Sequence, residues 1–237
     1  MRLIICENYN EISKKSAEIV AAQILLKPNC TLGLATGSSP VGMYENLTTM
    51  NLDFSEVTTF NLDEYYPINK KNDQSYYYFM NQHLYSKVNL SPEKIHIPNG
   101  SAADPQEECL AYDKAIEENG GIDLQVLGIG QNGHIGFNEP AETLLAGTHI
   151  TKLTQNTIEA NSRFFKKIED VPTQALTMGI APIMKAKTIL LIANGKSKAP
   201  AIKALMHGII DPKIPATLLS CHPNTIVIVD KEAASLL

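Results

Sequence analysis

The strongest constraint on the fold is an alternation of two kinds of segment along the whole chain. Short runs of apolar and β-branched residues alternate with longer amphipathic stretches. This order is typical of an α/β fold in which a mainly parallel sheet carries helices on both faces. Strands are predicted over residues 2–5, 31–34, 56–61, 124–128, 188–193 and 225–229.

Helices are predicted between these strands. Asn8, with Glu11 three residues later, resembles a capping box, so a helix begins there and ends before Pro28. No internal repeat, low-complexity tract or Gly/Ser linker divides the chain, which predicts one domain over residues 1–237. Further helices are predicted over residues 40–50, 75–85, 105–119, 156–165 and 197–207.

The length and the net charge of the chain indicate what kind of partner it binds. A globule formed by 237 residues buries about 70% of the surface of its extended chain, so neither disulfides nor a structural metal is needed. A net charge of -5 argues against an extended nucleic-acid surface. No apolar run reaches the ~20 residues that span a bilayer. The expected partner is therefore a small molecule, with no nucleic acid and no membrane.

The cysteines and the N-terminal segment indicate the compartment. Cys6, Cys30, Cys109 and Cys221 are scattered and form no C-x-x-C pair, which predicts buried free thiols in a reducing environment. The first residues reach Glu7 after four apolar positions and contain no signal-peptide core. A cytoplasmic location is predicted.

Ligands of an open parallel sheet bind beyond the carboxyl ends of its strands, and the first loop of interest there is Leu-Ala-Thr-Gly-Ser-Ser-Pro at residues 34–40. A helix N-terminus that follows such a turn attracts anions. Two interpretations stay open: a phosphate site with Arg163 and Lys198 as cationic partners, or an ordinary turn capped by Ser39 with both cations solvated. The residues that would contact a phosphate are Thr36, Gly37, Ser38 and Ser39.

The second loop, Phe-Asn-Leu-Asp-Glu-Tyr-Tyr-Pro at residues 60–67, ends a strand in two adjacent carboxylates. Their side chains point in different directions. One carboxylate can therefore face a pocket as a base, while the other has a structural role as a cap or as a member of an ion pair. Asp63 is the predicted base. A solvated acidic turn is the alternative.

The third loop is Leu-Gly-Ile-Gly-Gln-Asn-Gly-His-Ile-Gly-Phe-Asn-Glu-Pro at residues 127–140. Its first glycines match the dinucleotide fingerprint, but Pro140 interrupts the required helix and no acidic residue lies at the required distance. What remains is His134 and Glu139 five residues apart, and a histidine held by a carboxylate is a proton-transfer unit. We favour this functional interpretation over a structural histidine.

Other chemistries find little support in the sequence. The remaining histidines show no metal-ligand spacing, so no metal site is predicted. No serine lies in a G-x-S-x-G elbow, which argues against a serine hydrolase.

Six motifs follow one another along nearly the whole chain: L-A-T-G-S-S-P, F-N-L-D-E-Y, Q-S-Y-x-x-F-M, G-I-G-Q-N-G-H-I-G-F-N-E-P, N-S-R-F-F and P-T-Q-A-L-T-M-G-I. In this order they resemble the glucosamine-6-phosphate deaminase (glucosamine-6-phosphate isomerase) family. The resemblance implies a modified Rossmann-like α/β fold. It also implies conversion of glucosamine 6-phosphate and water to fructose 6-phosphate and ammonia, in amino-sugar catabolism, without an organic cofactor.

The resemblance also implies roles for individual residues. Asp63 becomes the base that moves the C2 proton, and His134 becomes the ring-opening acid/base, oriented by Glu139. The phosphate is held by the loop from Thr36 to Ser39 together with Arg163 and Lys198. Residues from about 142 to 177 resemble the mobile lid of the family.

One position departs from the pattern of many members, which carry Asp where this chain has Asn132. An amide does not stabilise an imidazolium as a carboxylate does, so the His134 relay is expected to rely on Glu139. The chain resembles the short form of the family. A monomer or small homo-oligomer, without activation by N-acetylglucosamine 6-phosphate, is therefore expected.

Two rival functions stay open. A 6-phosphogluconolactonase shares the glycine-rich histidine loop but follows it with T-A-S-L-F, so Glu139 and the Asp63–Tyr65 motif favour the deaminase. A non-catalytic sugar-phosphate-sensing domain of a transcription regulator uses a similar fold. The first predicted strand begins at residue 2, which leaves no room ahead of it for a DNA-binding module.

Overall fold

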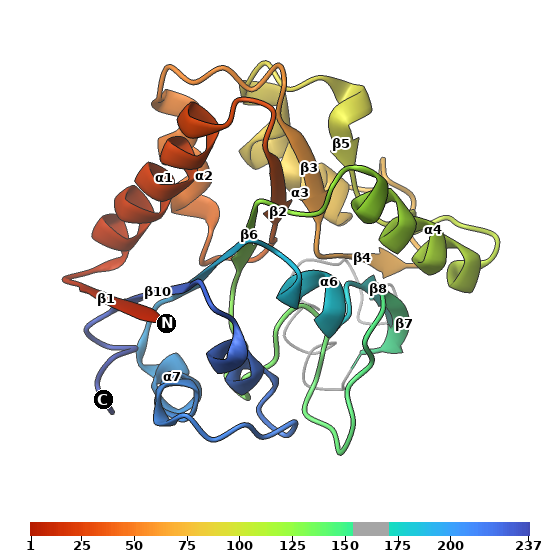
Figure 1. The fold of residues 1–237 in the computed structure, drawn as a ribbon. Coiled ribbons are helices and arrows are strands. Elements are labelled where there is room, and N and C mark those ends of the chain that lie inside the picture. Colours follow the sequence, from red (N-terminus) through yellow and green to blue (C-terminus); the bar gives the residue numbers. More distant parts are fainter. Residues whose placement is uncertain (154–170) are drawn as a thin grey trace.

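A computed structural model describes residues 1–153 and 171–237, and its centre is a seven-stranded sheet (Figure 1). The strand order is β1-β10-β9-β6-β2-β3-β5, and every neighbouring pair is parallel. The prediction of a mainly parallel sheet is confirmed. The strands are β1 (Arg2–Cys6), β2 (Thr31–Leu34), β3 (Thr58–Asn61), β5 (Ile95–His96), β6 (Leu124–Leu127), β9 (Thr188–Ala193) and β10 (Thr225–Asp230).

Helices cover both faces of this sheet, as predicted. In Figure 1, α1 and α2 lie on one side of β1 and β10, and α7 lies on the other. At the start of α1, Oδ1 of Asn8 accepts a hydrogen bond from the Glu11 amide at 3.1 Å, so the predicted cap is confirmed. The helices are α1 (Tyr9–Leu26), α2 (Val41–Thr49), α3 (Tyr76–His83), α4 (Pro105–Glu118), α6 (Ile180–Met184) and α7 (Ala199–His207).

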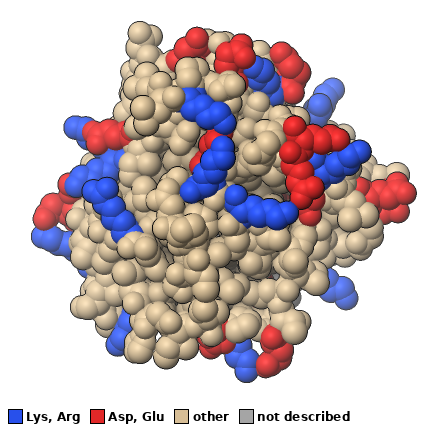
Figure 2. All heavy atoms as spheres, viewed as in Figure 1, with Lys and Arg blue, Asp and Glu red and all other residues tan. Residues whose placement is uncertain are grey.

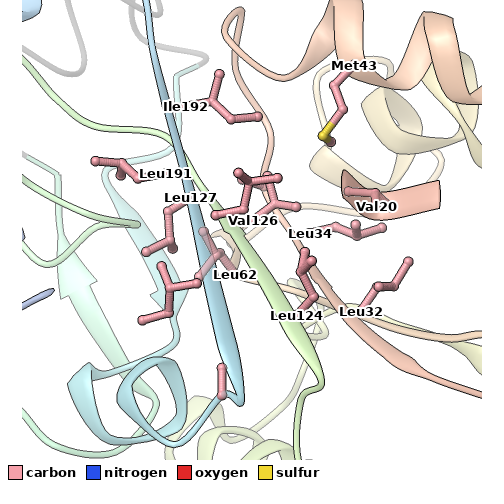
Figure 3. Close-up of a cluster of buried hydrophobic side chains, with 14 of the residues drawn as sticks. Val20, Leu32, Leu34, Met43, Leu62, Leu124, Val126, Leu127, Leu191 and Ile192 are labelled. Carbon is pink, nitrogen blue, oxygen red and sulfur yellow. The ribbon is translucent and has the colours of Figure 1, made fainter. Parts of the chain in front are cut away.

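The main core lies where the central strands meet α1 and α2. Figure 3 shows side chains of β2, β6 and β9 packed together with Val20 of α1 and Met43 of α2. Burial of each such Val, Leu or Met side chain stabilises the fold by about 1.5 to 3 kcal/mol. This core fixes the central strands whose carboxyl ends carry the predicted site loops.

A second, smaller sheet was not predicted. It has the order β4-β8-β7 and is antiparallel, with β4 (Asp63–Tyr66), β8 (Gln174–Thr177) and β7 (His149–Lys152). Leu62 alone separates β4 from β3. The small sheet therefore begins at the carboxyl end of the large one.

Part of the sequence prediction falls on residues 154–170, which lie outside the described residues. These include the helix expected over 156–165, Arg163, and the middle of the predicted lid over 142–177. Within that lid range, the two flanking segments form β7 and β8.

The surface facing the viewer in Figure 2 carries interspersed acidic and basic side chains. Within residues 1–153 and 171–237, no helix combines the length and apolar character needed to cross a membrane. The four cysteines are free thiols, as predicted, and three of them are buried. Burial was the wrong prediction for Cys221, which ends a 3₁₀ segment on the surface.

Asp123, just before β6, ties three segments together at the base of the sheet. Its buried carboxylate accepts hydrogen bonds from Nζ of Lys27 and Nζ of Lys187, each at 2.7 Å, and from the Thr31 amide at 2.8 Å. Burial alone would raise the pKa of Asp123, but these hydrogen bonds outweigh it and hold the pKa below its ordinary value.

Asp123→Ala is expected to lower the free energy of unfolding by about 2 kcal/mol, since a hydrogen bond to a charged group contributes about 1.5 to 3 kcal/mol and the exposed lysines are partly screened. Urea titration at pH 7 measures the loss. Because the folded-state pKa of Asp123 is depressed, its contribution to stability is fully present above the unfolded-state pKa. This contribution is lost as the pH falls through the folded-state pKa. Glu118→Ala, at an exposed pair with Lys114, is the control. Equal stability of Asp123→Ala and the parent would contradict the assignment.

Candidate active site

The three predicted site loops and the segment that carries Lys198 follow four neighbouring strands. Strands β9, β6, β2 and β3 are consecutive in the sheet and parallel, so their carboxyl ends lie along one edge. The chain leaves β2 outward toward β5 and later leaves β6 outward toward β1, which puts a topological switch point between β2 and β6. Ligands of open α/β sheets bind at such a point.

The loop after β2 is held by side chains from two other segments. The Ser39 hydroxyl donates to Oδ1 of Asn194 at 2.9 Å, which links this loop to the one after β9. The Tyr9 hydroxyl donates to the Ser38 carbonyl at 2.9 Å and accepts from the Gly42 amide at 2.9 Å. The alternative in which Ser39 caps the following helix is wrong, because Pro40 holds that position and the hydroxyl bonds to Asn194.

The same loop presents its backbone and hydroxyl groups to solvent. Gly37 and Ser38 are exposed, and Thr36 is half-buried. Gly37 has φ of 100°, a left-handed conformation that glycine adopts without strain. The loop can therefore keep an open turn against a bound anion.

Lys198 lies in the 3₁₀ turn Lys196–Lys198 that leads into α7. The Gly195 amide donates to both carboxylate oxygens of Asp230, at 3.1 and 3.0 Å, which anchors the start of this turn. Burial lowers the pKa of Lys198. Among the described residues, its ammonium has no hydrogen-bonding or ion-pair partner. It is a partly buried cation that is available to an anionic ligand.

Asp63 begins β4 and pairs with Thr177 of β8. Only 7% of its surface is exposed. Burial first, and then the negative charge of Glu64, raises the pKa of Asp63 to about 8. A carboxyl group with a pKa near the working pH can both accept and return a proton.

Glu64 turns to the other side of β4 and caps α3. Its carboxylate accepts hydrogen bonds from the amides of Tyr65 at 2.9 Å, Tyr76 at 2.8 Å and Tyr77 at 3.0 Å. Burial raises the pKa of Glu64 to about 7, although these three amides act in the opposite direction. The expected division of labour between the adjacent carboxylates, with one of them capping, is confirmed for Glu64.

His134 and Glu139 approach each other in the loop after β6. Nδ1 of His134 lies 3.2 Å from Oε1 of Glu139, within ion-pair distance, although the direction is not that of a hydrogen bond. Nδ2 of Asn132 donates to the other oxygen, Oε2 of Glu139, at 2.8 Å. Oδ1 of Asn132 accepts from the His134 amide at 3.2 Å. Asn132 therefore orients both members of the pair.

The glycines of this loop make room for the histidine and the aspartate. A β-carbon at Gly130 would lie 2.3 Å from the His134 ring, so only glycine fits beneath it. A β-carbon at Gly136 would lie 3.6 Å from Oδ2 of Asp63. The Asp63 carboxyl therefore lies beside the same loop that carries His134.

Several residues of this edge were missed from the sequence. The Thr177 hydroxyl accepts from the Phe137 amide at 3.0 Å, and the Asn138 amide group donates to the carbonyls of Ile135 at 2.9 Å and Met178 at 2.8 Å. These contacts hold the glycine-rich loop against β8. Asn194 had a usable signal, since it directly follows a predicted strand, whereas Thr177 had none because β8 itself was missed.

The family model described as glucosamine-6-phosphate isomerases/6-phosphogluconolactonase matches residues 7–228. The chain belongs to this family. A glucosamine-6-phosphate deaminase from Halothermothrix orenii is 54% identical over 241 residues, covering all of both chains.

Solved structures give the same result for the fold. A structure described as a monomeric glucosamine-6-phosphate deaminase is 43% identical and superposes with a TM-score of 0.97 over the full length of both chains. A 6-phosphogluconolactonase from Thermotoga maritima has a TM-score of 0.78 at 19% identity, covering 97% of this chain and 99% of that one. The second likeness concerns the fold alone.

A metal centre is not formed by the described residues, in which no three His, Cys, Asp or Glu side chains cluster.

Proposed function

We propose that this protein is a glucosamine-6-phosphate deaminase that isomerises its substrate to fructose 6-phosphate and releases ammonia. The observation that carries the proposal is the buried Asp63 carboxyl beside the loop of His134 and Glu139. The full-length similarity to proteins of that name supports the same reaction.

In the proposed mechanism, His134 opens the pyranose ring. It moves a proton between the ring oxygen and the anomeric hydroxyl, and Glu139 stabilises the charge that develops on the imidazole. The hydrogen bond from Asn132 to Glu139 leaves one carboxylate oxygen directed at His134. This arrangement supports the proposal that the relay relies on Glu139.

Asp63 then removes the C2 proton of the open-chain sugar. Because burial and Glu64 raise its pKa to about 8, the carboxylate is a stronger base than an exposed aspartate and can return the proton at the next carbon. Loss of the amino group from the resulting ketose imine, by hydrolysis, gives fructose 6-phosphate and ammonia.

The phosphate is proposed to lie between the loop from Thr36 to Ser39 and Lys198. The Ser39 to Asn194 hydrogen bond joins the β2 and β9 loops that carry these groups. Arg163 and the lid over residues 142–177 stay predictions from the resemblance.

Ammonia release from glucosamine 6-phosphate tests the function directly. We expect turnover of this sugar phosphate and, in a parallel assay, no hydrolysis of 6-phosphogluconolactone. Lactone hydrolysis without ammonia release would make the protein a lactonase, and inactivity on both substrates with tight binding of the sugar phosphate would make it a sensor.

Lys198→Ala is expected to lower kcat/KM for glucosamine 6-phosphate by roughly tenfold to 150-fold, because a hydrogen bond to a charged group contributes about 1.5 to 3 kcal/mol. Steady-state kinetics measure the change, with Lys196→Ala in the same turn as the exposed control. Unchanged kcat/KM in Lys198→Ala would remove this residue from the phosphate site.

Hyperbolic kinetics are expected, with a monomer or small oligomer in solution, because the chain matches a structure described as monomeric over its full length. Sedimentation and Hill analysis measure both properties. A Hill coefficient well above one that falls when N-acetylglucosamine 6-phosphate is added would contradict the expectation.

A further inference from the structure

A cavity of about 680 Å³ lies apart from the candidate active site, between α4, β5 and the segment that follows β4. Its described lining contains none of the phosphate-loop residues, nor His134, Glu139 or Lys198. The volume is within the range of about 300 to 1,000 Å³ that small-molecule sites occupy. Among the lining residues, Glu64 lies next to Asp63 in β4.

Apolar and aromatic side chains form part of the cavity wall. Helix α4 contributes Ala111 and Ala115, one turn apart, whose small side chains leave the helix face flat. Tyr77, His96 and Tyr112 add aromatic rings to the lining. A flat aromatic ligand would find both an apolar helix face and rings to pack against.

Two of these rings are fixed before any ligand arrives. His96 stacks on Phe60 with ring centroids 4.3 Å apart and an interplanar angle of 8°. The hydroxyl of Tyr112 donates to the Asn61 carbonyl at 2.8 Å. A preorganised lining reduces the entropy lost on binding.

The lining contains two lysines and two glutamates, and the lysines are the charged groups available to a ligand. Lys70 and Lys71 are exposed and have no carboxylate within ion-pair distance in the described part of the chain; Nζ of Lys70 lies 5.7 Å from the Tyr77 ring centroid. The two carboxylates of the lining already accept backbone hydrogen bonds. Glu64 accepts those that cap α3, and Glu108 accepts one from the Asn99 amide at 2.9 Å.

We propose that this cavity is a second ligand site, which binds a small aromatic anion. The ring packs along Ala111 and Ala115 of α4, and the negative group pairs with Lys70 and Lys71. The site is distinct from that of the sugar phosphate.

The first test uses 8-anilinonaphthalene-1-sulfonate, a fluorescent flat aromatic sulfonate, with the intact protein. We expect saturable binding at one site per chain that glucosamine 6-phosphate does not displace. Ala111→Trp fills the cavity from an exposed position of α4 and is expected to weaken binding at least tenfold. Leu110→Trp is the matched control, because Leu110 is 73% exposed on the same helix and does not line the cavity.

The second test changes charge without changing packing. The double variant Lys70→Gln/Lys71→Gln is expected to weaken binding of the sulfonate about threefold to tenfold and to reduce its salt dependence. Lys14→Gln, at an exposed position of α1, is the control.

Three results would each overturn the proposal: no saturable binding, displacement by glucosamine 6-phosphate, or unchanged affinity in either Ala111→Trp or the lysine double variant. Ammonia release plays no part in this test. Its failure therefore leaves the proposed function intact, and failure of the deaminase assay leaves the second site intact.

Discussion

Asp63→Asn is expected to lower ammonia release from glucosamine 6-phosphate by roughly 10²-fold to 10⁴-fold, the usual contribution of a positioned general base. The amide keeps the shape of the side chain but does not accept the C2 proton. Exchange of that proton with solvent deuterium, followed by mass spectrometry of recovered substrate, is expected to fall by the same factor.

The stability of Asp63→Asn is not expected to fall with its activity. The pKa of Asp63 is raised to about 8 in the folded protein, so the folded state binds more protons than the unfolded state between the two pKa values. Ionisation of Asp63 in the folded protein therefore lowers the free energy of unfolding, and this loss becomes larger as the pH rises toward 8. Asp63→Asn removes this cost, and its Tm at pH 8.5 is expected to equal or exceed that of the parent.

Asp113→Asn is the control, because it replaces a carboxylate with a structural role and not the proposed catalytic one. Asp113 of α4 accepts hydrogen bonds from the amide and the hydroxyl of Thr148, so its replacement is expected to lower Tm and leave kcat nearly unchanged. If Asp63→Asn instead loses stability and keeps its deuterium exchange, Asp63 belongs to the scaffold and the proposed base is wrong.

Six of the seven strands of the large sheet could be predicted, and the longest of them are almost continuous apolar runs. Both faces of β9 and β10 are covered, so Thr188–Ala193 and Thr225–Asp230 read as strands without reference to their neighbours. The first helix was equally readable, from the Asn8 cap to Leu26. In these segments local preference and tertiary packing agree.

The small sheet could not be predicted, because its strands are defined by their pairing. β4 reads Asp-Glu-Tyr-Tyr, and acidic residues disfavour an isolated strand. It becomes a strand through its antiparallel ladder with β8. β5, the strand of the large sheet that was not predicted, has only two residues, Ile95 and His96, and pairs with β3. No sequence pattern of that length distinguishes a strand from a loop.

The sequence indicated the reactive side chains of the candidate site but not all of the residues that hold its loops in place. Asp63, His134 and Glu139 could be proposed from the sequence because each lies beyond the end of a predicted strand, where the topology gathers ligand contacts. Tyr9 was missed because it lies in the first turn of α1, far along the chain from the loop whose Ser38 carbonyl it holds. Such contacts depend on tertiary packing and leave no local signal.

His134→Asn is expected to separate ring opening from enolisation. It removes the group that releases the open-chain aldehyde, so ammonia release from the closed pyranose is expected to fall by roughly 10²-fold. Fructose 6-phosphate supplies its open-chain form in solution. Incubated with ammonia in D₂O, it is therefore expected to exchange its C1 proton within about tenfold of the parent rate, because Asp63 is intact.

Two further variants serve as controls for this comparison. Asp63→Asn is expected to lose both reactions together. His149→Asn, whose Nδ1 lies 2.9 Å from the Gly147 carbonyl, is expected to keep both. Glu139→Gln acts through the histidine, so its smaller loss is expected in the forward direction only. If His134→Asn abolishes C1 exchange as completely as Asp63→Asn does, then the histidine takes part in proton transfer at carbon, and the two steps are not divided between the loops after β3 and β6.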